Sequence, residues 1–257
     1  MQAQTTASFS GTTTVLGSGF SGPTGVAVDG SGNVFVADTE NNAVKEIVAV
    51  SGSIPASNPT INVLGSGFNA PAGVAVDGSG NVFVADTSNN LVKEIVAVNG
   101  SIPASNPTIN VLGSGFNGPF GVAVDGNGNV FVADTSNNLV KEIVAVSGSI
   151  PASNPTINVL GSGFNGPFGV AVDGNGNVFV ADTGNSLVKE IVAVSGSIPA
   201  SNPTINVLGG GFDEPIGVAV DGNVFVGDSF NGLVKGDRSG QWQYSSDPDD
   251  TDAGQWL

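Results

Sequence analysis

The stretch GVAVDGSGNVFVADTENNAVKEI, residues 25–47, determines the fold of this 257-residue chain because it recurs along the sequence. Its opening string GVAVDG returns at a constant spacing and begins at Gly25, Gly73, Gly121, Gly169 and Gly217. Self-similarity at a fixed period is typical of proteins built from stacked repeats. The chain is therefore predicted to contain five units of one kind.

Each unit contains four segments with the composition of short β-strands. In the first unit these are residues 25–29, 33–38, 44–50 and 61–65, which are rich in Val and Ile and are separated by Gly, Asn and Pro. Four antiparallel strands in a unit of about 40–50 residues are typical of a propeller blade. We therefore predict an all-β fold, a five-bladed β-propeller of four-stranded antiparallel blades.

The two ends of the repeat region are incomplete. The segment TTTVLGSGF, Thr12–Phe20, matches the fourth strand of the later units but has no blade of its own, and the unit that begins at Gly217 lacks its fourth strand. We expect the N-terminal strand to complete the last blade, which closes the propeller and covers an open strand edge. The alternative is a propeller of the six-bladed type, truncated or completed by domain swapping.

The repeat pattern divides the chain into three parts: an N-terminal extension (1–11), the propeller (12–235) and an acidic tail (236–257). Codons for Gly236–Tyr244 can be chosen so that dropping one base restores the repeat text EIVAVSGS. The tail is therefore interpreted as repeat sequence read out of frame, and it is expected to be disordered. The nucleotide sequence tests this interpretation directly.

The segments P-x-GVAVD, GNVFVADT and NN-x-V-K resemble the NHL repeat from Leu16 to about Lys235. This resemblance implies a propeller, often a six-bladed one, and it indicates fold far better than function. NHL-like amidating lyases use a histidine-bound zinc ion, whereas lactonase-like propellers hold a central divalent ion with carboxylate and Asn ligands. A chain without histidine cannot assemble the first kind of site.

Composition excludes several classes of function. The chain has no Cys and no His, so disulfides, thiolate metal sites and triads with a histidine base are ruled out. Its formal net charge of −16 argues against nucleic-acid binding. No apolar run approaches the roughly 20 residues of a membrane helix, and the N-terminus lacks the apolar core of a signal peptide. We expect a monomer without a membrane span.

The repeat generates two sets of carboxylates, which are expected on opposite faces of the propeller. The first-turn set is Asp29, Asp77, Asp125, Asp173 and Asp221, and the second-turn set is Asp38, Asp86, Asp134, Asp182 and Asp228. The second-turn set is the candidate site for Ca²⁺ or Mg²⁺, which favour hard oxygen ligands. Turn formation is the competing interpretation, because Asp side chains bond to nearby backbone N–H groups. No cofactor is expected otherwise.

The Lys-Glu pairs on the third strands, such as Lys45-Glu46, are predicted to lie at solvated edges between blades. The two residues of each pair should point to opposite faces of their strand.

Differences between units mark a second candidate site. The residue before each GVAVD varies, as does the residue after each ADT or GDS, and these positions are expected at one mouth of the propeller. The candidate ligand-binding residues are Thr24, Ala72, Phe120, Phe168, Ile216 and Phe230. Four of them are large and apolar, so a contiguous patch would mark a binding surface. Drift in surface loops is the competing interpretation.

These observations favour a non-enzymatic binding or scaffold module whose ligand is a protein or a small molecule. A divalent-metal-dependent, lactonase-like hydrolase is the first alternative. The second is a recently amplified repeat protein without a tuned ligand site. The resemblance and the low Lys and Arg content favour an extracellular or cell-surface location in a bacterium.

Overall fold

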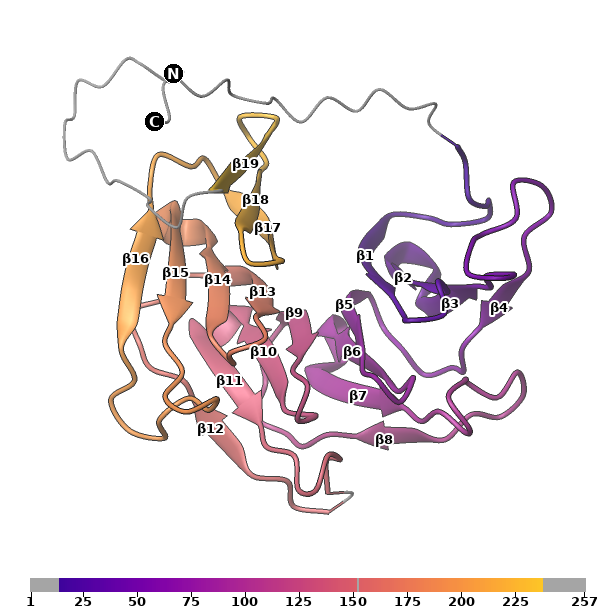
Figure 1. Ribbon diagram of the computed structural model, residues 1–257, viewed down its shortest axis with the longest axis horizontal. Helices are drawn as coiled ribbons and strands as arrows, with labels where there is room; N and C mark the ends of the chain where they lie inside the picture. Colours follow the sequence, from indigo (N-terminus) through magenta and orange to yellow (C-terminus); the bar gives the residue numbers. More distant parts are fainter. Residues whose placement is uncertain (1–13, 152, 238–257) are drawn as a thin grey trace.

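A computed structural model describes residues 14–151 and 153–237, which form five β-sheets arranged as the blades of a propeller (Figure 1). Blade 1 contains β1 (Pro23–Val28), β2 (Val34–Asp38), β3 (Ala43–Ile47) and β4 (Ile61–Val63). Blade 2 contains β5 (Pro71–Val76), β6 (Val82–Asp86), β7 (Leu91–Ile95) and β8 (Ile109–Val111). Blade 3 contains β9 (Pro119–Val124), β10 (Val130–Asp134), β11 (Leu139–Ile143) and β12 (Ile157–Val159). Blade 4 contains β13 (Pro167–Val172), β14 (Val178–Asp182), β15 (Leu187–Ile191) and β16 (Ile205–Gly209). Blade 5 contains β17 (Pro215–Val220), β18 (Val224–Asp228) and β19 (Leu233–Asp237).

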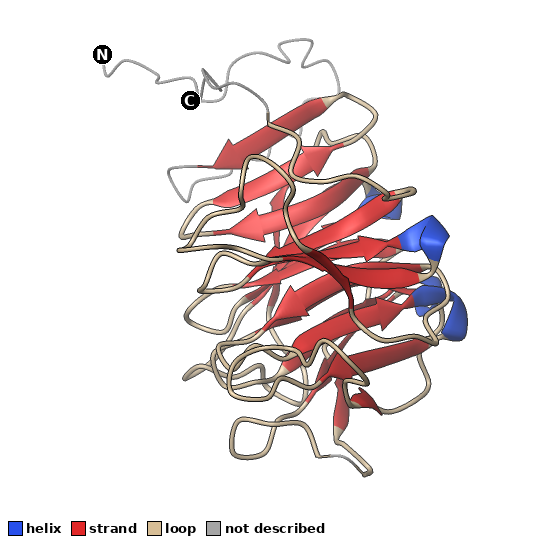
Figure 2. Cartoon of the chain, turned by 90° about the vertical axis from the view of Figure 1, so that its right-hand side faces the viewer, coloured by secondary structure: helices blue, strands red, loops and turns tan. Residues whose placement is uncertain are grey.

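Within each blade the strands pair in sequence order and antiparallel, as the strand and turn pattern predicts. The second and third strands of the first four blades are joined by single 3₁₀ turns: η1 (Thr39–Asn41), η2 (Thr87–Asn89), η3 (Thr135–Asn137) and η4 (Thr183–Asn185). These turns all lie on one side of the molecule (Figure 2). We call this side the second-turn face and the opposite side, with the hairpins between first and second strands, the first-turn face.

The third strands are shorter than predicted. β3 ends at Ile47 rather than continuing to Val50, because Val50 turns back and exchanges hydrogen bonds with Ser53 at 2.8 and 3.3 Å. The fourth strand of that blade ends at Val63, ahead of Gly65, whose φ of +82° is incompatible with an extended strand.

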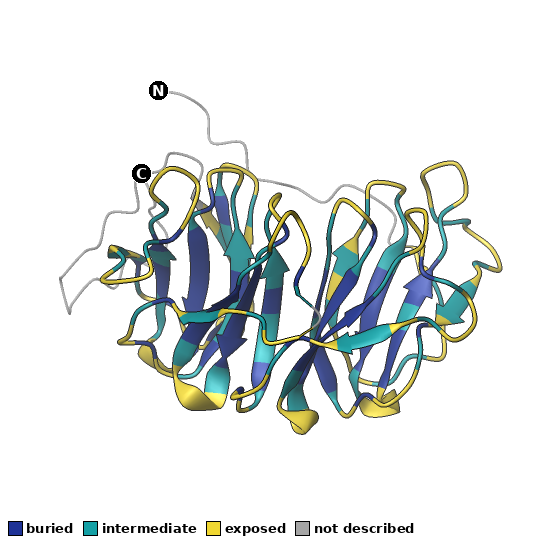
Figure 3. Ribbon diagram, turned by 90° about the horizontal axis from the view of Figure 1, so that it is seen from below, coloured by how far each residue is buried: buried dark blue, intermediate teal, exposed yellow. Residues whose placement is uncertain are grey.

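The hydrophobic core lies between neighbouring blades rather than inside any one of them. One cluster joins Phe35 and Val44 of blade 1 to Val74 and Val82 of blade 2, and it includes Leu64, which directly follows the outer strand of blade 1. Equivalent clusters join blades 2 and 3, 3 and 4, and 4 and 5. Buried residues therefore concentrate in the strands, and exposed residues in the turns of both faces (Figure 3).

The five blades follow an open arc in the described part of the chain. Blades 1 and 5 stand at its two ends (Figure 1), and the inner strands adjoin in the order β1, β5, β9, β13, β17. Val26 on the free flank of blade 1 is 65% exposed, whereas its counterpart Val74 in blade 2 is 7% exposed. The difference arises because no described blade covers that flank.

Blade 5 differs from the predicted four-stranded blade, because only three of its strands are among the described residues. Of the predicted closing strand, Thr12 and Thr13 fall outside the description, and residues 14–20 contain no strand. Closure by this segment therefore stays a prediction. β19 continues through Gly236 to Asp237, two residues past the predicted boundary at 235, and the rest of the predicted tail and extension 1–11 lie outside the described residues.

Candidate functional site

The candidate ligand positions on the inner strands lie together on the second-turn face. Pro23 pairs with Asp38, so the start of β1 lies beside the end of β2. The hydroxyl of Thr24 is therefore 2.7 Å from that of Thr39, the first residue of η1. The corresponding positions on the other inner strands are Ala72, Phe120, Phe168 and Ile216. The preceding prolines pair with the second-turn aspartates in the same way, so these five residues lie on the second-turn face, and their role in ligand binding stays a prediction.

Phe120 and Phe168 form an aromatic pair at the centre of this row. Their ring centroids are 4.6 Å apart and their planes are tilted by 59°. Both side chains are half-buried, so each leaves part of its ring accessible. Tilted aromatic pairs at this separation are favourable beyond the area that they bury. The pair is the part of the predicted apolar patch that the structure brings into direct contact.

Glycine at the next position makes this contact possible. A Cβ atom built on Gly121 would lie 2.4 Å from the carbonyl oxygen of Phe168. One built on Gly169 would lie 2.4 Å from the carbonyl oxygen of Ile216. Neighbouring inner strands thus approach backbone to backbone, and only a residue without a side chain fits between them.

The remaining candidate residues are placed less uniformly. Ala72 is buried, and its carbonyl oxygen accepts a hydrogen bond of 2.9 Å from the hydroxyl of Thr24. Phe230 lies in the turn between β18 and β19 and is 71% exposed, and its backbone N–H donates to the carbonyl oxygen of Asp213. No described contact joins Phe230 to the aromatic pair.

Each second-turn carboxylate forms a buried ion pair with a lysine of the third strand of its blade. We call this ion pair, with the hydrogen bonds around it, the lock. The Asp38 carboxylate has no exposed surface and accepts hydrogen bonds from the backbone N–H of Ser21 (2.7 Å) and the side chain of Asn41 (2.8 Å). The ammonium of Lys45 is 2.5 Å from its second oxygen, Oδ2. The same ion pair recurs in Asp86–Lys93, Asp134–Lys141, Asp182–Lys189 and Asp228–Lys235.

The lock also binds the segment that precedes the first strand of each blade. Lys45 donates to the carbonyl oxygen of Gly19 at 2.7 Å, and its ammonium lies 5.0 Å from the centre of the Phe20 ring. An ammonium over an aromatic face is attracted by the ring electrons. Burial alone would raise the pKa of Asp38, but the hydrogen bonds and the charge of Lys45 outweigh it and lower the pKa below its ordinary value. The pKa of Asp228 is lowered for the same reasons.

The predicted solvation of the Lys-Glu pairs is wrong. The lysines and glutamates of the third strands are largely buried, because each finds a partner on its own face of the blade. Lys45 reaches the Asp38 carboxylate, and Glu46 accepts a hydrogen bond of 2.9 Å from the side chain of Asn62. A signal for the lock exists in the sequence, since a lysine follows the aspartate at the same spacing in all five units.

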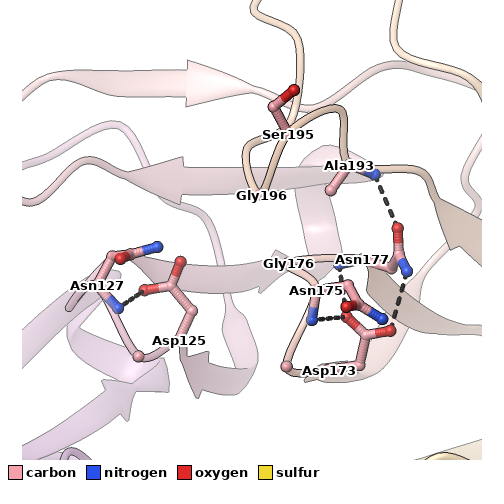
Figure 4. A pocket seen from close by; sticks show the side chains of 11 residues that line it. Asp125, Asn127, Asp173, Asn175, Gly176, Asn177, Ala193, Ser195 and Gly196 are labelled. Carbon is pink, nitrogen blue, oxygen red and sulfur yellow. Dashed lines mark hydrogen bonds between the residues drawn. The ribbon is translucent and has the colours of Figure 1, made fainter.

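The first-turn carboxylates stabilise the hairpins. Asp125 accepts hydrogen bonds from the backbone N–H groups of Asn127 (2.9 Å) and Asn129 (2.8 Å). With the Asp173 turn of the next blade it lines a cavity of about 760 Å³ on the first-turn face (Figure 4). Nearby, burial raises the pKa of Glu142, and the negative charge of Asp125 adds to this, against a lowering by Asn158.

The structure does not gather the candidate metal ligands. The second-turn carboxylates lie in separate blades, where donors of the protein already occupy their oxygens. Within residues 14–151 and 153–237, no three Asp or Glu side chains converge as metal ligands would. In the same part of the chain, no helix is long and apolar enough to cross a membrane.

Comparison with known sequences identifies the repeat. The NHL repeat family matches residues 20–47, 68–95, 116–143 and 164–191. Each match runs from the phenylalanine of the lock to the end of the third strand. The chain is an NHL-repeat β-propeller. The fifth unit lies beyond these matches, and its first turn, Asp221-Gly222-Asn223, is two residues shorter than the Asp-Gly-x-Gly-Asn turn of the other units. No curated protein matches the chain.

Solved structures resemble this NHL propeller in fold. A chain of a nidogen–laminin complex superposes with a TM-score of 0.64 at 16% identity, over 83% of this chain and 74% of that one. A candidate gluconolactonase gives 0.62 at 14% identity, over 86% and 79%. Virginiamycin B lyase from Staphylococcus aureus gives 0.58 at 13% identity, over 84% and 69%. At these identities the likeness establishes the fold alone.

Proposed function

We propose that this NHL propeller is a non-enzymatic binding module whose ligand contacts the second-turn face at the Phe120–Phe168 pair. The observation that carries the proposal is this half-buried pair at the inner edge of the arc, 4.6 Å between centroids. The units are nearly identical at most other positions, whereas this one changes from Thr to Ala, Phe, Phe and Ile. Partly accessible aromatic rings are common anchors of binding surfaces.

Residue chemistry supports a binder over the enzymes among the structural neighbours. A histidine-to-alanine variant of the virginiamycin B lyase is described as catalytically inactive, and this chain has no histidine. A lactonase-like hydrolase that depends on Ca²⁺ or Mg²⁺ is the competing proposal, because one neighbour is a candidate gluconolactonase. The locked second-turn carboxylates do not favour it.

An extracellular or cell-surface location in a bacterium belongs to the same proposal. It is supported by the small number of basic residues, six Lys and Arg against 22 Asp and Glu. A surface of this charge suits a soluble module that avoids nucleic acid.

Ligand-observed NMR with a library of small aromatic and aliphatic fragments tests the binding site. We expect a subset of fragments to bind the wild-type chain and to be lost in the Phe120→Ser/Phe168→Ser variant. Val194→Ser is the matched control, because Val194 is an exposed apolar residue in the loop after β15, on the first-turn face. The proposal fails if no fragment distinguishes the double variant from the control, as a repeat protein without a tuned site would behave.

Calorimetric titration with CaCl₂ tests the hydrolase alternative. Tight binding of one ion per chain, together with cleavage of a lactone that depends on that ion, would replace the binding proposal.

A further inference from the structure

Among the residues that the structure describes, β19, the third strand of blade 5, has no fourth strand beside it. In blades 1 to 3 the fourth strand is held to the third by a hydrogen bond from a leucine N–H to a valine carbonyl. These bonds run from Leu64 to Val44 (2.8 Å), from Leu112 to Val92 (2.8 Å) and from Leu160 to Val140 (2.9 Å). Val234 of β19 occupies the corresponding valine position, and no described strand pairs with the outer edge of β19.

The exposure of the Val234 side chain shows that no described strand covers this edge. It is 79% exposed, whereas its four counterparts in blades 1 to 4 are completely buried. Strand edges of this kind are templates for the addition of another strand.

The chain also carries a segment of closely matching sequence that forms no strand with any described residue. Thr14-Val15-Leu16-Gly17 matches the Asn-Val-Leu-Gly text of the fourth strands at three of four positions. Val15 is 81% exposed and Leu16 is 40% exposed, whereas Leu112, a counterpart of Leu16, is 1% exposed. This donor segment, residues 14–17, therefore lacks the blade that its counterparts cover.

Donor and acceptor lie at opposite ends of the arc. The donor segment leads directly into blade 1, where the lock holds Gly19 and Ser21. β19 belongs to blade 5, across the opening in Figure 1. One copy of the chain in this arrangement therefore does not join its own donor to its own acceptor.

We propose that two copies of the chain associate by strand exchange, in which the donor segment of one copy pairs with β19 of the other. Val15 then lies opposite Lys235, as Val63 lies opposite Lys45 in blade 1. The N–H of Leu16 donates to the carbonyl oxygen of Val234, as the N–H of Leu64 donates to that of Val44 in blade 1. Gly17 and Ser18 lie between Leu16 and the anchored Gly19, and the glycine allows the backbone to turn there, so the strand can reach a second copy.

Sedimentation velocity of the full chain over a hundredfold range of concentration tests the exchange. We expect association that Val15→Lys and Val234→Lys each weaken at least tenfold. Both valines are exposed in the single copy, so neither substitution disturbs its core. The control Val194→Lys changes another exposed valine, in the loop after β15, and should leave association unchanged.

An equal mixture of the two variants distinguishes strand exchange from non-specific association. Val15→Lys keeps its acceptor and Val234→Lys keeps its donor, so the mixture should form a heterodimer although neither variant associates alone. A wild-type chain that stays monomeric at all concentrations overturns the proposal. If the wild type is monomeric and both variants have a lower thermal midpoint than the wild type, the donor segment instead pairs with β19 of its own chain. Association that all three substitutions leave unchanged also overturns it.

Discussion

The close approach of the inner strands makes a sharp prediction about two glycines that occupy the same position in different blades. A Cβ on Gly121 would meet the carbonyl oxygen of Phe168 at 2.4 Å, the amide nitrogen of Val170 at 3.0 Å and the Cα of Gly169 at 3.2 Å. All three are backbone atoms, so they cannot rotate away as a side chain would. A Cβ on Gly217, in blade 5, would meet nothing within 4 Å.

The expected effects of Ala at these positions have opposite signs. Overpacking typically costs about 1–3 kcal/mol, so Gly121→Ala should lower the free energy of unfolding by about that amount. Gly217→Ala meets no neighbour and restricts the unfolded chain, so it should raise that free energy by roughly 0.5 kcal/mol. Neither glycine has a positive φ, so backbone strain does not complicate the comparison.

Urea unfolding of the two variants and the wild type, followed by circular dichroism, measures the contrast. The difference between the variants should be about 2 kcal/mol, which corresponds to roughly 4–8 °C in thermal midpoint for a domain of this size. Equal destabilisation by both substitutions would refute the reasoning, because Gly217 would then face β1 in a closed propeller. Tolerance of both would show that the inner strands do not touch.

Three further predictions concern the locks and the aromatic pair. Asp134→Asn leaves the buried ammonium of Lys141 without its carboxylate and should cost roughly 3 kcal/mol in urea unfolding; a loss below about 1 kcal/mol would contradict a buried pair. Because the folded-state pKa of Asp38 is lowered, its stabilisation is complete above the ordinary value of 3.8 and is lost as the pH falls through the folded-state pKa. Unfolding measured from pH 6 to pH 2 should show this loss, and Asp38→Asn should reduce the slope. A double-mutant cycle of Phe120→Ala and Phe168→Ala should give a coupling of about 1 kcal/mol, and additive effects would argue against their contact.

Much of the fold follows from the sequence because every unit repeats the same local pattern. Alternating valines, the Asp-Gly hairpins and the prolines of the long loop predict four strands and their order, and the structure confirms them in blades 1 to 4. Strand ends are less predictable, since they depend on where a loop turns back, as at Val50.

The site was predicted in part. Propeller topology places Thr24 and its counterparts on one face, but their contacts depend on side-chain packing, so the Phe120–Phe168 pair could not be derived from spacing. The lock is hard to predict because charged residues are usually solvated. In the antiparallel register Val36 faces Lys45, which places Asp38 diagonally across from that lysine on the same face of the blade. The fixed spacing of aspartate and lysine therefore contains the information, once the register is known.

The lock has a consequence for how such a chain changes in length over generations. Its partners all lie within one stretch, from Gly19 to Lys45 in the first unit, and the stretch recurs with the same contacts in blades 2 to 5. A duplication or deletion of one period therefore carries a complete set of buried charges and leaves none unmatched. Unequal crossing-over can therefore lengthen or shorten this gene by whole blades without leaving an unpaired charge in the interior.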